Sequence, residues 1–167
     1  MSFPKILLAA SSLAIVSSAV PSRAAGAQTT AAQTVTFAVN AINQISFTGA
    51  PSLIITSATT GGALTSVTSA AGPTWSVTTN QSTAKITASI PTAMPTGLTL
   101  SANLTATGAG TSAGLVALGT APVDVVTGIT KVSVSGMAVS YQLDATAAAG
   151  VVASSTRIVT YTITGGT

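Results

Sequence analysis

The side chains that could do chemistry are few. The chain has no histidine, cysteine or glutamate, and its only acidic residues are Asp124 and Asp144. This inventory excludes Ser-His-Asp triads, Cys-His pairs and the usual clustered metal sites. Two carboxyl groups could in principle flank a glycosidic bond, but Asp124 alternates with two valines, which predicts that it faces solvent, and Asp144 is expected at a strand end. We therefore expect no enzyme activity, no catalytic or metal-binding residue and no cofactor.

Two further candidates also favour plain structural roles. The spacing of Lys131 and Asp144 permits a self-formed isopeptide crosslink, but no asparagine lies near them in the sequence, so exposed lysines are expected. Trp75 could stack on a sugar ring, yet it alternates in register with Val77, which predicts a core position. A glycan partner therefore has no support in the sequence.

The first residues are typical of a secretory signal. Lys5 precedes an uncharged stretch of apolar and small residues, 6–20, which ends at Pro21. The stretch is shorter than the ~20 residues that span a bilayer, and Ala25-Gly26-Ala27 resembles a signal-peptidase site. We expect residues 1–27 to be cleaved and residues 28–167 to be secreted, remaining extracellular or at the cell surface. No later segment is predicted to span a membrane.

The exported part is nearly uncharged. Charged residues make up 4% of the chain, against about 25% in typical domains. After residue 27 they are Lys85, Lys131, Arg157, Asp124 and Asp144. Nucleic acid is excluded as a partner, because phosphate binding needs clustered Lys or Arg. Low charge also removes the repulsion that keeps free monomers apart, which favours a protein that associates with copies of itself.

The apolar pattern predicts an all-β fold, with β-branched residues alternating between polar ones. About nine short strands bounded by turn signals indicate a single β-sandwich of immunoglobulin-like or jelly-roll topology. The apolar positions fall at 33–39 continuing through 45–47, then at 53–55, 74–78, 86–90, 98–104, 115–118, 123–126, 132–143 and 158–164.

Four details of the pattern carry separate expectations. A change of phase at Gly136 indicates a β-bulge. Residues 53–55 are predicted to be a strand buried on both faces. The glycine-rich residues 108–114 are predicted to be a flexible loop, and residues 145–153 a link with a helical turn.

The N-terminal strand predicted at residues 33–39 could act between molecules. Val35, Phe37 and Val39 alternate with Thr34, Thr36 and Ala38. In donor-strand complementation such a strand completes the sheet of a neighbour, with backbone hydrogen bonds for affinity and alternate side chains filling a groove. The alternative, which the pattern leaves open, is that it pairs within its own domain as an edge strand.

The opening Gln33-Thr-Val-Thr-Phe-Ala-Val and the closing Arg157-Ile-Val-Thr-Tyr-Thr-Ile-Thr resemble bacterial secreted pilin-like and spore-coat-like β-sandwich subunits. The chain differs from many of these in having no cysteine. The resemblance implies a structural subunit of an extracellular filament, pilus or surface coat, and no functional residues carry over from it. The alternative from another class is a monomeric binding module or adhesin that recognises a glycan or surface through loops such as residues 108–114.

Overall fold

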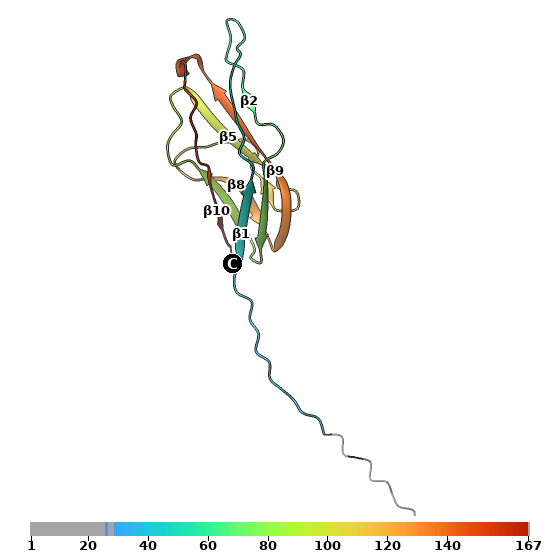
Figure 1. Cartoon of the computed structure of the whole chain (residues 1–167). Coiled ribbons are helices and arrows are strands. Elements are labelled where there is room, and N and C mark those ends of the chain that lie inside the picture. The colour runs from blue at the N-terminus through green and yellow to red at the C-terminus, as the bar shows by residue number, and fades with distance from the viewer. Residues whose placement is uncertain (1–25, 27–28, 167) are drawn as a thin grey trace, which may run out of the picture. The chain divides into compact units, whose positions relative to one another are not determined.

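The computed structural model describes residues 26 and 29–166 (Figure 1). The predicted signal, residues 1–27, lies outside the described residues apart from Gly26. The chain divides into two units, Met1–Phe37 and Ala38–Thr167, and all described strands belong to the second. In the first unit the described residues form neither helix nor strand and are exposed.

The second unit is a sandwich of two antiparallel sheets, which confirms the predicted all-β sandwich. The larger sheet is six-stranded and contains, in spatial order, β1 (Asn43–Thr48), β3 (Thr74–Thr79), β9 (Val132–Ala145), β5 (Leu98–Leu104) and β7 (Val116–Ala117), with β2 (Val67–Thr68) also paired to β9. The four-stranded sheet contains, in order, β10 (Thr160–Thr164), β4 (Ala84–Ser89), β8 (Val123–Ile129) and β6 (Thr111–Ser112). A 3₁₀ turn, Ala147–Ala149, lies in the predicted 145–153 link.

The core lies between the two sheets and is built by the alternation of each strand. Trp75 and Leu104 from the larger sheet meet Ile86 and Val126 from the smaller one, all fully buried. Successive side chains of a strand point to opposite faces, so most of the intervening polar residues lie on the outer faces, although Ser101 of β5 is buried. Trp75 is therefore a core residue, as its register predicts.

The predicted bulge at Gly136 is confirmed. Trp75 pairs with Met137, whereas Val77 pairs with Val134, so β9 carries one extra residue between these two pairs. Gly136 has a φ of 71°, which glycine adopts without a steric cost. Met137 lies three residues after Val134, so simple alternation would turn it away from the core. The bulge restores its inward direction, as a β-bulge is expected to do.

Two local predictions are wrong. Residues 53–55 form no strand, and Ile54 is 67% exposed, because no neighbouring strand covers its outer side. Residues 108–114 are not a free loop: they contain β6, which pairs with β8, and Ala109 is buried. Gly110 in this segment allows a tight approach of two backbones.

Gly110 shows this constraint most sharply, and its replacement is expected to destabilise the fold. Its φ is 96°, and an added Cβ would collide with the carbonyl oxygen of Thr127. We expect Gly110→Ala to lower the free energy of unfolding by about 3 kcal/mol, since backbone strain and a clash with backbone add. Urea unfolding measures this loss.

The matched control is Gly114→Ala. Gly114 also has a positive φ, 76°, but an added Cβ there meets nothing within 4 Å. It should cost only about 1 kcal/mol, from the backbone conformation alone. Equal losses for the two variants would contradict a steric role for Gly110.

Candidate assembly site

The predicted donor residues are exposed and outside every strand. Val35 is 74% exposed, Phe37 89% and Val39 80%. No strand pairing involves residues 33–39 in the described part of the chain. In this structure the segment is not paired as the intramolecular edge strand that the pattern left open as an alternative. Its three large apolar side chains are exposed.

The link between this segment and β1 is held by Asn80. The Asn80 side-chain amide donates to the Asn40 carbonyl at 2.7 Å, and its oxygen accepts from the Ile42 amide at 2.8 Å. The backbone N–H of Asn80 donates to the Ile42 carbonyl at 3.3 Å. These contacts continue the pairing of Asn43 with Thr79. Residues 40–42 therefore follow the line of β1, and a hairpin back along β1 would have to break them.

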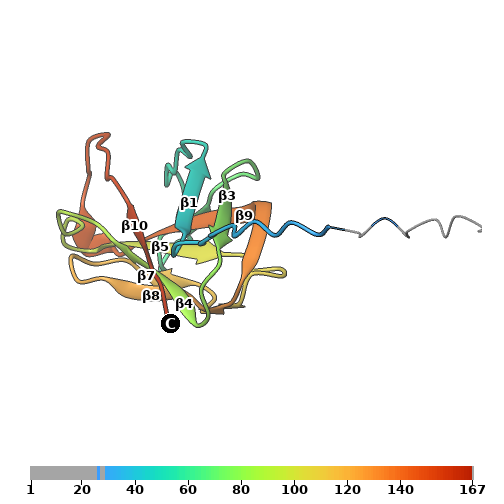
Figure 2. The same cartoon turned by 90° about the horizontal axis from the view of Figure 1, so that it is seen from below.

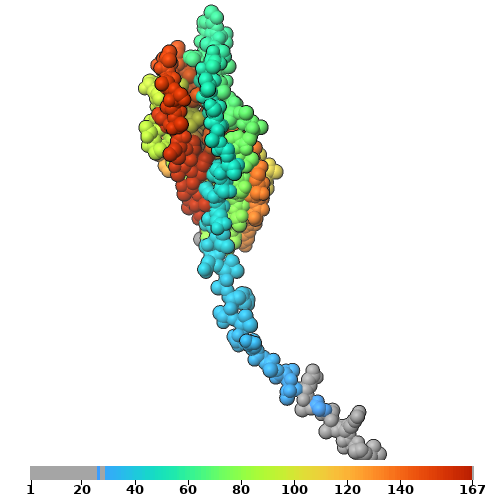
Figure 3. Space-filling view, in the orientation of Figure 1, coloured from blue at the N-terminus to red at the C-terminus, as the bar shows by residue number. Residues whose placement is uncertain are grey.

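The two sheets present free edges at the same side of the sandwich. β1 ends the larger sheet and β10 ends the smaller one, and the two strands lie side by side in both views (Figures 1 and 2). Figure 3 shows the red C-terminal segment beside the blue-green segment of β1 on this face. We call the apolar residues that these strands turn toward each other the β1–β10 seam: Ile45, Phe47, Tyr161 and Ile163.

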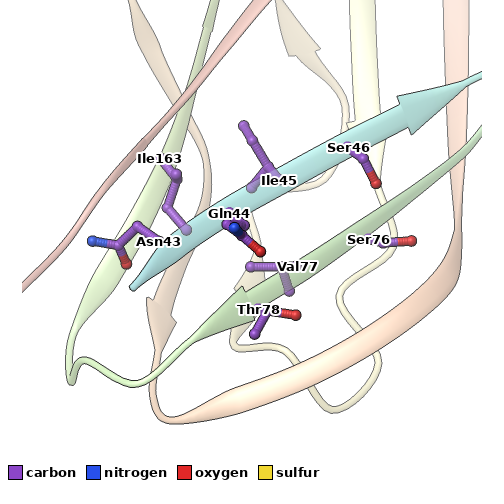
Figure 4. Close-up of a pocket in the computed structure, with 8 residues that line it drawn as sticks. All are labelled: Asn43, Gln44, Ile45, Ser46, Ser76, Val77, Thr78 and Ile163. Carbon is purple, nitrogen blue, oxygen red and sulfur yellow. The ribbon is translucent and has the colours of Figure 1, made fainter. Parts of the chain in front are cut away.

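The seam is less covered than the buried cluster at the centre of the core. Its four residues are only partly buried, whereas Ile86, the inward residue of β4 that pairs with Ile163, is fully buried. An open depression runs over the edge of β1 at one end of the seam, where Ile163 lies near Ile45 and Val77 (Figure 4). The seam thus has apolar surface that the domain itself leaves partly uncovered.

Aromatic side chains join the two sheets in the middle of the seam. The rings of Phe47 and Tyr161 are stacked with centroids 3.9 Å apart, and Phe47 also stacks on Trp75 at 6.3 Å. The Tyr161 hydroxyl donates to that of Tyr141 at 2.9 Å. Burial raises the pKa of both tyrosines, and for Tyr161 the neighbouring Tyr141 raises its pKa further.

These raised pKa values predict alkaline destabilisation. In the unfolded chain a tyrosine has a pKa near 10, so above about pH 10 the unfolded state loses protons that the folded state retains. The free energy of unfolding should be unaffected by this pair below pH 10 and fall as the pH rises further. Urea unfolding at pH 8, 10 and 11 measures the slope, which should be shallower in Tyr161→Phe. If the slope were the same in Tyr161→Phe, titration of Tyr161 would not cause the alkaline loss of stability.

The other candidate residues are not brought together. Asp124 lies on β8 and Asp144 on β9, in different sheets. Asp124 forms a surface ion pair with Lys85 at 3.0 Å, and Asp144 accepts hydrogen bonds from Gln142 and Ser66. Each carboxylate therefore has its own local partners, and the two do not form a common site. Lys131 lies in the turn between β8 and β9.

Sequence reasoning singled out the exposed residues Val35, Phe37 and Val39 as candidates, but it did not predict the seam or the Asn80 contacts. Tyr141 and Tyr161 are both partly buried, and the Tyr161 hydroxyl donates a hydrogen bond to that of Tyr141. Nothing local in the sequence distinguishes Ile163 in an open seam from Ile86 in the closed core, because both follow the same alternation. The difference arises only from the order of strands in each sheet.

Among residues 26 and 29–166, no helix is long and apolar enough to cross a membrane. Neither a scan against protein-family models nor searches of curated proteins and of solved structures found a match. The exposed segment 33–39 and the β1–β10 seam are therefore the features of this chain from which its function is argued.

Proposed function

We propose that the chain is a non-enzymatic structural subunit of an extracellular filament, pilus or surface coat. Copies assemble by β-strand exchange, in which residues 33–39 of one copy add a strand to a sheet of another. The observation that carries the proposal is the exposure of Val35, Phe37 and Val39 on a segment that pairs with no strand among the described residues.

The energetics favour covering this segment. Burying a Val or Phe side chain contributes about 1.5–3 kcal/mol, so the three together offer roughly 6 kcal/mol. The backbone hydrogen bonds of an added strand contribute further affinity. Against these stand the costs of association and of ordering the segment. A single exposed apolar residue needs no explanation, but three in strict alternation on an unpaired segment do.

The outer surface supports assembly in the same way. The outward side chains of β1 are Gln44, Ser46 and Thr48, and those of β10 are Thr160, Thr162 and Thr164. Natural edge strands of monomeric sheets are commonly protected by Lys, Pro or inward charges. Neither edge here carries a charge or a proline, so each is open to a further strand.

A monomeric binding module is the competing function, and two features weigh against it. Trp75 is fully buried and cannot offer its ring to a sugar. Residues 108–114, the predicted recognition loop, contain β6, which pairs with β8.

Electron microscopy tests the proposal on the purified chain beginning at Gln28. We expect regular fibres that grow with protein concentration, whereas a binding module stays monodisperse. A chain that remains monomeric at millimolar concentration, as judged by light scattering and microscopy, would refute the proposed function.

A further inference from the structure

We infer that the acceptor site of each copy is its β1–β10 seam, and that the incoming segment lies antiparallel to β10. In this arrangement Val35, Phe37 and Val39 of one copy lie beside Ile163, Tyr161 and Val159 of the next. The inference rests on the proposed function and adds to it the place, the direction and the register of the exchange.

Unpaired backbone at the seam supports this place. Within the described residues β10 pairs with β4 alone and β1 pairs with β3 alone, so each has one edge of free N–H and C=O groups. A strand added beside β10 satisfies such groups and extends the four-stranded sheet. The other ends of the sheets, β6 and β7, are only two residues long and offer a shorter template.

The side chains match in number, spacing and character. Val159, Tyr161 and Ile163 recur at every second position, turn toward the core and are partly buried. Val35, Phe37 and Val39 also recur at every second position. In antiparallel pairing, residues directly opposite lie on the same face of the sheet. Phe37 then falls beside Tyr161, where it extends the existing stack of Tyr161 on Phe47.

The direction follows from where the strands begin and end. A Cβ built on Gly165, just after β10, would meet the side chain of Asn43, so β10 ends where β1 begins. The donor segment leads into β1 at that same end, and Asn80 keeps residues 40–42 in line with it. A segment antiparallel to β10 enters the neighbour's seam at this end and leaves it at the opposite end.

This direction places the copies head to tail. The β1 start of one copy then lies at the far end of the other, so the same contact can repeat without limit and gives an open filament. A segment parallel to β10 would instead leave by the end at which β1 begins. That would bring two like ends together and favour a closed pair. Filament formation and the antiparallel direction are therefore linked by the topology.

Disulfide trapping tests the register, because the chain has no cysteine of its own. The test variant is Val35→Cys with Ile163→Cys, and the matched variant is Val39→Cys with Ile163→Cys, both in the chain beginning at Gln28. Positions 35 and 39 are about 13 Å apart along a strand, and a disulfide needs Cα atoms within about 7 Å. After mild oxidation, we expect a ladder of covalent multimers on a denaturing gel for the first variant alone.

The other outcomes are distinct. A ladder from the second variant alone would overturn the direction, and a disulfide closed within single chains would overturn exchange between copies. Fibres seen by microscopy without a ladder from either variant would overturn the seam as acceptor while leaving the filament proposal standing. Absence of fibres from the unmodified chain would refute the proposed function itself.

Discussion

Deletion of residues 28–39 should leave a folded domain that forms no fibres. Every described strand and every buried core residue lies after this segment, so the sandwich loses none of its own packing. The proposed polymer would lose the strand that joins one copy to the next. Circular dichroism should show an unchanged β spectrum, and electron microscopy should show fibres only for the chain that begins at Gln28. Fibres of normal appearance from the deleted chain would refute strand exchange through this segment.

Point variants separate the apolar face of the segment from its backbone. Phe37→Asp puts a charge on the face that is proposed to enter the seam, and Thr36→Asp puts the same charge on the opposite face. Loss of one buried Phe costs about 2–3 kcal/mol, which corresponds to a rise of about 30- to 150-fold in the concentration needed for assembly. The buried charge adds to this loss. Thr36→Asp should assemble at close to the normal concentration. Equal effects of the two variants would contradict the proposal that only the Val35, Phe37 and Val39 face of the segment enters the seam.

The strands that the sequence predicts best are those that bury one face. β5 (Leu98–Leu104) has the predicted bounds, since Leu100, Ala102 and Leu104 all enter the core. The bulge at Gly136 could also be predicted, because a one-residue change of phase must be accommodated where the sheet is packed on one side. In both cases the local pattern is the physical cause of the structure.

The failures arise where a neighbour distant in the sequence decides the outcome. Residues 53–55 have the composition of a buried strand, but in the part of the chain that the structure describes no strand covers Ile54. Residues 108–114 have the composition of a loop, but β8 pairs with them. The seam could not be predicted for the same reason. That β1 and β10 become adjacent free edges follows from the strand order of the two sheets, which no local pattern encodes.

Replacement of Trp75 should cause the largest loss of stability of any single substitution in the core. Its side chain is fully buried, stacks on Phe47, and donates from Nε1 to the Thr105 carbonyl at 2.9 Å. Trp75→Ala removes these contacts and leaves a cavity, which costs about 3–5 kcal/mol. Total stabilities of domains are about 5–15 kcal/mol, so the variant should unfold at much lower urea concentration, as measured by far-ultraviolet circular dichroism.

Two further variants serve as controls for Trp75→Ala. Trp75→Phe keeps an aromatic ring but leaves the Thr105 carbonyl without its donor, and it should cost about 1–3 kcal/mol; it also serves if Trp75→Ala does not fold. Phe37→Ala should leave the unfolding of the monomer unchanged, because Phe37 is 89% exposed, yet it should weaken assembly. A core aromatic and an assembly aromatic would thus be distinguished by opposite effects on unfolding and on fibre formation. If Phe37→Ala destabilised the monomer as much as Trp75→Phe does, residues 33–39 would belong to their own domain, and strand exchange would lose its donor.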